Sequence, residues 1–198
     1  MKTIRRITPQ EAILCWLRAE LSSDRFSDDL TKSLENHDSS RILLTNANLN
    51  DGEENELRYK ILKSYRGWLE DDLYEYDWVL VELNKDEVGD LQYINYSYWS
   101  ELSDNTHRVS VAARNVKNGK IVFDVSNDRF WEIANALESH KPLEPIIVLQ
   151  DSTNLPSRIV EGHARATSYL LSDKIQENLQ AALGIKRVIN QKSAPPRT

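Results

Sequence analysis

The sequence predicts an α/β (α+β) protein, in which a mainly helical first part precedes a small mixed sheet with helices. Helix-capping signals and a helical apolar period dominate the first part, which we place at residues 1–118. Two β-rich segments, 145–149 and 157–161, then follow each other, and a glycine joins the second one to a helix. We therefore expect one compact unit: residues 1–118 packed on an α/β region at 119–190, with a flexible tail at 191–198.

The strongest helix signal of the first part lies near its beginning. Thr8 is a typical N-cap residue, Pro9 fits the first helical position, and Glu11 completes a capping box. Apolar spacing predicts helices at residues 9–22, 27–36 and 53–69, with a loop at 37–52.

The middle of the chain mixes strand and helix signals. Residues 78–83 are β-rich, and the capping-box pattern that begins at Asn84 starts a short helix that ends near Tyr93. Further signals predict helices at 109–117 and 127–139, and a short extended piece at 121–125.

The last third alternates strands and helices. The expected order is a strand at 145–149, a polar turn at 151–156, a strand at 157–161 and a helix from Gly162 to about Leu171. Ser172 and Asp173 resemble the cap of one more helix, which ends at Gly184. A last strand is expected at 185–189.

Composition places the chain among ordinary globular proteins, with 40% hydrophobic and 28% charged residues in a length of 198. A single cysteine, Cys15, excludes an internal disulfide framework and a cysteine-based zinc cluster. The N-terminus lacks the apolar core of a secretory signal, and no apolar run reaches the length of a membrane span. We therefore expect a cytoplasmic protein that does not bind membranes.

Charge is unevenly distributed around a net value of −6, which argues against broad, sequence-independent DNA binding. Residues 51–92 hold 13 acidic against 5 basic residues, whereas residues 186–198 hold four basic residues and no acidic one. One interpretation is a solvated acidic helix followed by a basic tail. In the other interpretation, region 51–92 binds a basic protein partner and the tail binds a nucleic acid.

The strand-to-helix junction around Gly162 is the most informative segment. Glycine permits a backbone turn that other residues resist, and His163, Arg165 and Thr167 then fall in the first turns of the helix. Free backbone N–H groups and the positive end of the helix dipole favour anions at such a place. An arginine there does not serve helix stability, so the pattern predicts a phosphate site.

Each residue of this junction has a predicted role. The amides after Gly162 and the Arg165 guanidinium would hold phosphate, and Glu161 and His163 are the candidates for an acid or base. The predicted phosphate-binding residues are Gly162, His163, Arg165, Ala166 and Thr167. The alternative is a tight structural turn, with Glu161 bonded to local amides and Arg165 paired to an acid. The four histidines show no zinc-binding spacing, so no metal site is expected.

Aromatic residues are dense between Tyr93 and Trp99. Such rings could stack on a nucleobase, but packing inside the protein is the favoured interpretation.

Three motifs in order resemble a known superfamily: Phe130-Trp-Glu-Ile-Ala-Asn-Ala-Leu137, then Pro145-Ile-Ile-Val-Leu149, then Ile159-Val-Glu-Gly-His-Ala-Arg-Ala166. Over about residues 127–190 the chain resembles the ParB N-terminal/sulfiredoxin-like superfamily, which includes the ParB-like nuclease domain. The resemblance implies a small mixed sheet and contact with nucleotide phosphates, in the form of CTP or ATP with Mg²⁺. His163 stands where sulfiredoxins have their cysteine, and Ala164 and Thr167 stand where ParB-like proteins tend to have arginines.

Three functions follow from the junction and the resemblance. The first is binding of a nucleotide or a nucleic-acid phosphate at Glu161–Arg165. The second is a non-catalytic protein-interaction module that keeps the fold. The third is a metal-dependent nuclease, for which Glu161 and Asp151 would be the nearby acids.

Overall fold

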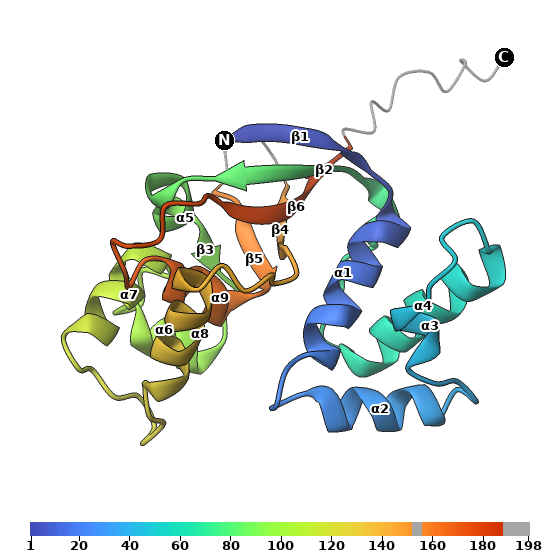
Figure 1. The fold of residues 1–198 in the computed structure, drawn as a ribbon, viewed down its shortest axis with the longest axis horizontal. Helices are drawn as coiled ribbons and strands as arrows, with labels where there is room; N and C mark the ends of the chain where they lie inside the picture. The colour runs from blue at the N-terminus through green and yellow to red at the C-terminus, as the bar shows by residue number, and fades with distance from the viewer. Residues whose placement is uncertain (152–155, 188–198) are drawn as a thin grey trace, which may run out of the picture.

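A six-stranded mixed sheet lies at the centre of the computed structural model, which describes residues 1–151 and 156–187 (Figure 1). Its strands are β1 (Lys2–Ile7), β2 (Tyr76–Leu83), β3 (Gln92–Tyr93), β4 (Ile146–Gln150), β5 (Arg158–Glu161) and β6 (Leu179–Lys186). The helices are α1 (Pro9–Leu21), α2 (Ser27–Glu35), α3 (Ile42–Thr45), α4 (Gly52–Tyr65), α5 (Lys85–Asp90), α6 (Ser97–Leu102), α7 (Val109–Lys117), α8 (Asp128–Glu138) and α9 (His163–Tyr169), with a 3₁₀ turn at Leu73–Glu75. The α/β class is thus confirmed.

The sheet combines strands from both ends of the chain, in the order β1-β2-β6-β4-β5-β3. Strand β6 pairs antiparallel with β2 along its whole length and parallel with β4. Strand β5 runs antiparallel to β4 and parallel to β3. Residues before and after position 118 therefore share one sheet.

Each face of the sheet buries its own hydrophobic core, because successive strand residues point to opposite sides. Trp78, Ile147 and Ala182 face a core built with α1–α4. Val81 and Val148 face a core built with α5–α9. Figure 1 shows the two groups of helices gathered on separate sides of the molecule.

Local capping signals position several helices as the sequence predicts. The Thr8 hydroxyl accepts a hydrogen bond from the Glu11 amide at 3.2 Å. Asn84 and Glu87 form a complete capping box at the start of α5. Each bond satisfies an amide that the helix itself leaves without a partner.

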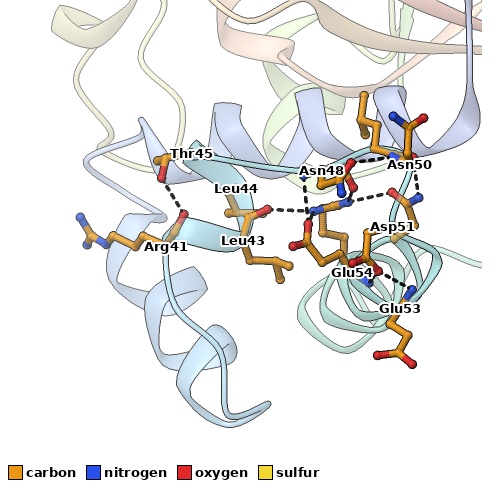
Figure 2. A network of polar contacts seen from close by, with 12 residues as sticks. Arg41, Leu43, Leu44, Thr45, Asn48, Asn50, Asp51, Glu53 and Glu54 are labelled. Atoms are coloured by element: carbon orange, nitrogen blue, oxygen red, sulfur yellow. Dashed lines mark hydrogen bonds and ion pairs between the residues drawn. The ribbon is translucent and has the colours of Figure 1, made fainter.

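A buried arginine holds the segment between α3 and α4. The Arg58 side chain is fully buried and donates to the carbonyl oxygens of Leu43 at 2.9 Å and Asn48 at 3.0 Å, and to Glu54 at 2.9 Å. Figure 2 shows Leu43, Asn48 and Glu54 converging on this point, with Asp51 capping α4 beside them. Loop oxygens that would attract a cation are thus occupied by the chain's own guanidinium.

Residues 1–118 contain the expected helices but do not form a separate helical extension. The chain begins with β1, and the first 118 residues supply three of the six strands. Five of the six β1 residues are exposed, so no buried alternation marks the strand in the sequence. Its pairing partner lies far along the chain, with Lys2 opposite Glu82.

The prediction of a helix from Ser172 to Gly184 is wrong, because β6 begins at Leu179. The four-residue spacing of Ile175, Leu179 and Leu183 imitates a helix. The strand is buried on both faces between β2 and β4, which removes the polar alternation of an exposed strand.

Smaller differences concern short segments. Residues 121–125 form a tight turn with a single bridge between Val122 and Val125, in place of an extended piece. The expected last strand at 185–189 is represented by the end of β6 at Lys186. Most of the expected turn at 151–156, the end of that last strand and the tail at 191–198 lie outside the described residues.

Candidate functional site

Gly162 forms the junction between β5 and α9 in a left-handed conformation, with φ of 90°. A Cβ atom at this position would lie 2.8 Å from Cβ of Ile146 and 3.0 Å from Nη2 of Arg165. Backbone conformation and close approach both require glycine here. The sharp turn brings Glu161 and Arg165 into contact and places His163 against the rings of Trp99 and Tyr93.

Arg165 is bound from two sides by the protein itself. Its Nη2 group donates to the Glu161 carboxylate, and its Nη1 group donates to the Glu144 carbonyl oxygen at 2.8 Å. The side chain is 12% exposed. The pairing is the one expected for a structural turn, and it also holds the guanidinium in a fixed orientation.

Glu161 is a largely buried carboxyl group, with a side chain that is 16% exposed. Burial raises the pKa of Glu161 to about 7, with a further rise from the negative charge of Glu20. Arg165, Arg66 and the Gly162 backbone favour the ionised form and oppose that rise. Glu161 therefore takes up a proton at a higher pH than an exposed glutamate does.

A second buried ion pair lies close enough to influence the first. Glu20 is 2% exposed and accepts hydrogen bonds from Arg66 and from Trp16 Nε1, the latter at 3.2 Å. The Arg66 guanidinium also lies over the rings of Phe26 and Tyr65. Burial of this kind is tolerated because each charge has a partner.

We call Glu20, Arg66, Glu161 and Arg165 the charge cluster. Glu20 comes from α1, Arg66 follows α4, Glu161 ends β5 and Arg165 lies on α9. Sequence reasoning identified Glu161 and Arg165 but missed Glu20 and Arg66. Glu20 follows Trp16 by four residues in an apolar helix face, which is a weak signal for a buried carboxylate.

His163 packs among aromatic rings. Its ring is stacked on Trp99 with centroids 5.2 Å apart, and lies 5.8 Å from the Tyr93 ring. Burial lowers the pKa of His163 to about 3, and the positive charge of Arg66 adds to this effect. The ring is therefore neutral at pH 7, unlike an exposed histidine, which titrates near neutrality.

Two buried nitrogen atoms at this place have no hydrogen-bond partner within residues 1–151 and 156–187. They are Arg66 Nε and His163 Nε2. Buried polar atoms usually have partners, so each such atom calls for an explanation.

Ala166 and Thr167 lie on the inner side of α9. Both are completely buried, and the Thr167 hydroxyl donates to the His163 carbonyl oxygen and bonds to the Tyr93 hydroxyl, each at 2.8 Å. In this structure these two predicted phosphate ligands contribute to packing. Gly162, His163 and Arg165 are the members of the predicted set that meet at the turn.

The aromatic stretch serves packing in this structure. The rings of Tyr93 and Trp99 are stacked with centroids 4.8 Å apart, and Trp99 meets Phe130 edge-on. These rings hold His163, and through it the first turn of α9, against the core.

Asp151 belongs to a different polar network from Glu161. It accepts hydrogen bonds from Arg158 at 3.1 Å and from Tyr76 at 2.7 Å, and the same two side chains also bind Asp71. Burial alone would raise the pKa of Asp151, but the bonds from Arg158 and Tyr76 lower it overall. Asp151 is bound to Arg158, the first residue of β5, whereas Glu161 is the last residue of that strand. The two acids proposed for a nuclease therefore lie near opposite ends of β5.

The acidic region 51–92 is extensively paired within the chain. Eight of its acids form ion pairs: Glu54, Glu56, Asp71, Glu75, Asp77, Glu82, Glu87 and Asp90. Asp51 and Asp72 cap helical turns. The formal charge of the region therefore overstates the negative charge that it offers to a partner.

No family model, curated protein or solved structure matches the chain. In the part of the chain that the structure describes, none of the helices combines the length and the apolar character needed to span a bilayer.

Proposed function

We propose that the protein binds a phosphorylated ligand, in the first place a nucleotide, at the charge cluster beside Gly162. The observation that carries the proposal is the proximity of two ion pairs, Arg66 with Glu20 and Arg165 with Glu161. They lie close enough for the charges of Glu20 and Arg66 to shift the pKa of Glu161. Guanidinium groups are the preferred partners of phosphate, because their N–H groups match two phosphate oxygens at once. The ParB-like order of motifs around Gly162 supports the same conclusion.

The arginines must supply most of the attraction. Helix α9 has only seven residues, so its dipole contributes little compared with a long helix. The Nε atom of Arg66 adds a donor that has no partner within the described ranges. A phosphate group between the two guanidinium groups would give this atom an acceptor.

A magnesium ion that accompanies the nucleotide would need ligands from outside the protein's own side chains. Among residues 1–151 and 156–187, no three His, Cys, Asp or Glu residues are grouped to hold a metal ion. Magnesium bound to a nucleotide commonly takes its ligands from phosphate oxygens and water. The cluster therefore suits a ligand that brings the ion with it.

The test is a thermal-shift experiment with CTP and ATP, each with and without Mg²⁺. A ligand at 100 times its Kd stabilises the folded state by about 2.7 kcal/mol, which raises the melting temperature by several degrees. We expect the shift in the wild type and in Arg5→Ala, whose surface pair with Glu11 lies outside the cluster. We expect its loss in Arg165→Ala, and equal shifts in all three proteins would refute the proposed site.

A second candidate function, binding of a protein partner, is favoured by the turn at 121–125. Its Phe123 and Asp124 both have positive φ, of 52° and 56°, although two-residue turns of this kind favour asparagine and glycine. The Phe123 side chain is 64% exposed, between the exposed Ile121 and Val125. Crosslinking in cells tests this function, since Phe123→Ser should lose a specific crosslinked partner that the wild type retains.

A further inference from the structure

Arg165 already holds a carboxylate where a phosphate would bind. Its Nη2 group is engaged by Glu161 and its Nη1 group by the Glu144 carbonyl oxygen. Carboxylate and phosphate use the same pair of guanidinium donors. A phosphate that approaches Arg165 therefore competes with Glu161 for the Nη2 group.

The net charge of the cluster also changes when phosphate binds. Two arginines and two glutamates sum to zero when all four are ionised, so an added phosphate brings an excess negative charge into a poorly hydrated place. Uptake of one proton by a carboxylate removes part of that excess. Uncompensated buried charge is costly, so phosphate binding with uptake of a proton has a lower free energy than binding without it.

Glu161 is the carboxylate best placed to take the proton. Glu20 is held by three side-chain donors, from Arg66, Trp16 and Tyr65. Among the described residues, the side-chain donor on Glu161 is Arg165, which the phosphate would take over. Loss of that donor would leave Glu161 facing the negative charges of Glu20 and of the ligand.

We infer that Glu161 is a proton-coupled gate of the phosphate site: phosphate replaces Glu161 on Arg165, and Glu161 takes up a proton as it is displaced. The inference rests on the proposed function. No covalent bond changes, and the proton comes from solvent. Its consequence is tighter binding of phosphate at lower pH.

The groups around Glu161 support this assignment. They are Arg165 and His163 on α9, Arg66 after α4, Glu20 on α1 and the Gly162 amide. Burial raises the pKa of Glu161 to about 7, so protonation costs little at neutral pH. His163, with its pKa lowered to about 3, stays neutral from pH 6 to 8 and does not compete for the proton.

Isothermal titration calorimetry with inorganic pyrophosphate, CTP and ATP tests the gate. Titrations from pH 6 to 8.5, in two buffers of different ionisation enthalpy, give both the Kd and the number of protons taken up. For the wild type we expect about one proton taken up above pH 7 and a Kd that rises about tenfold per pH unit there. Glu161→Gln should bind about tenfold more tightly than the wild type at pH 8, with no such proton uptake.

Control variants separate the gate from other effects. Asp90→Asn removes a carboxylate from an exposed pair with Arg108 and should keep the wild-type Kd and proton uptake. Titration of the ligand's own phosphate appears equally in all three proteins, so the difference between them reports Glu161. Melting curves of Glu161→Gln, an isosteric change, show whether the variant is folded.

The outcomes distinguish the gate from the proposed function. If the wild type binds and Glu161→Gln binds equally or more weakly, the gate is overturned, but the proposed phosphate site is still supported. Proton uptake that persists in Glu161→Gln would also overturn it. Absence of binding by both folded proteins for all three probes would overturn the gate and the proposed function together.

Discussion

Gly162 is the residue on which the candidate site depends, because it combines a left-handed backbone with close contact to Ile146. The turn that it permits brings Glu161 and Arg165 together. A larger residue would have to move either the strand or the helix. The site and the fold therefore share one backbone requirement at this position.

We predict that Gly162→Ala destabilises the protein more than Gly119→Ala does. Both glycines have positive φ, which costs an alanine about 1–2 kcal/mol. A Cβ at Gly119 has no atom within 4 Å, whereas a Cβ at Gly162 would overlap with Ile146, which adds roughly 1–3 kcal/mol. Urea unfolding of the two variants measures the difference, and equal losses of stability would contradict the steric part of the argument.

At the scale of elements, the signals that succeed are local. The capping residues Thr8 and Asn84 start α1 and α5 as the sequence predicts, because a cap acts on amides two or three positions away. Strands β1 and β6 are missed, since their stability comes from partners distant in sequence. The same distinction holds for the candidate site. Glu161 and Arg165 are four residues apart and were predicted from the sequence, whereas Glu20 and Arg66 join them only through tertiary packing.

We predict an energetic coupling between Trp78 on β2 and Gly184 on β6. The two residues are directly opposite in the register, and a Cβ at Gly184 would lie 3.0 Å from the Trp78 ring. Gly184→Ala should therefore cost roughly 1–3 kcal/mol in the wild type and less in a Trp78→Phe background, where the ring is smaller. A double-mutant cycle measures the coupling, and strictly additive effects would contradict the close contact.

At the scale of the whole molecule, Glu161 and His163 at the Gly162 turn contribute opposite dependences of stability on pH. Glu161 has its pKa raised from 4.5 to about 7, so the folded state binds more protons than the unfolded state between these values. Its contribution to stability is fully present below pH 4.5 and is lost as pH rises towards 7. His163 has its pKa lowered from 6.5 to about 3, so its contribution is present above pH 6.5 and is lost as pH falls.

We predict that two variants will show the Glu161 and His163 contributions to the pH dependence of stability separately. Each slope approaches about 1.4 kcal/mol per pH unit, and between pH 4.5 and 6.5 they largely cancel in the wild type. His163→Phe keeps the stacking on Trp99 and leaves the Glu161 slope, so its stability relative to the wild type should fall as pH rises across that interval. Glu161→Gln leaves the His163 slope, and its relative stability should rise.

Urea unfolding at half-unit steps from pH 4 to 8 gives these relative stabilities, because titration of all other groups cancels in the difference from the wild type. The direction of each slope is the decisive result. A His163→Phe curve parallel to the wild type would mean that His163 is hydrated and titrates normally in the folded protein. A parallel Glu161→Gln curve would mean that Glu161 stays ionised at pH 6, and the proton needed for the gate would then have no acceptor at neutral pH.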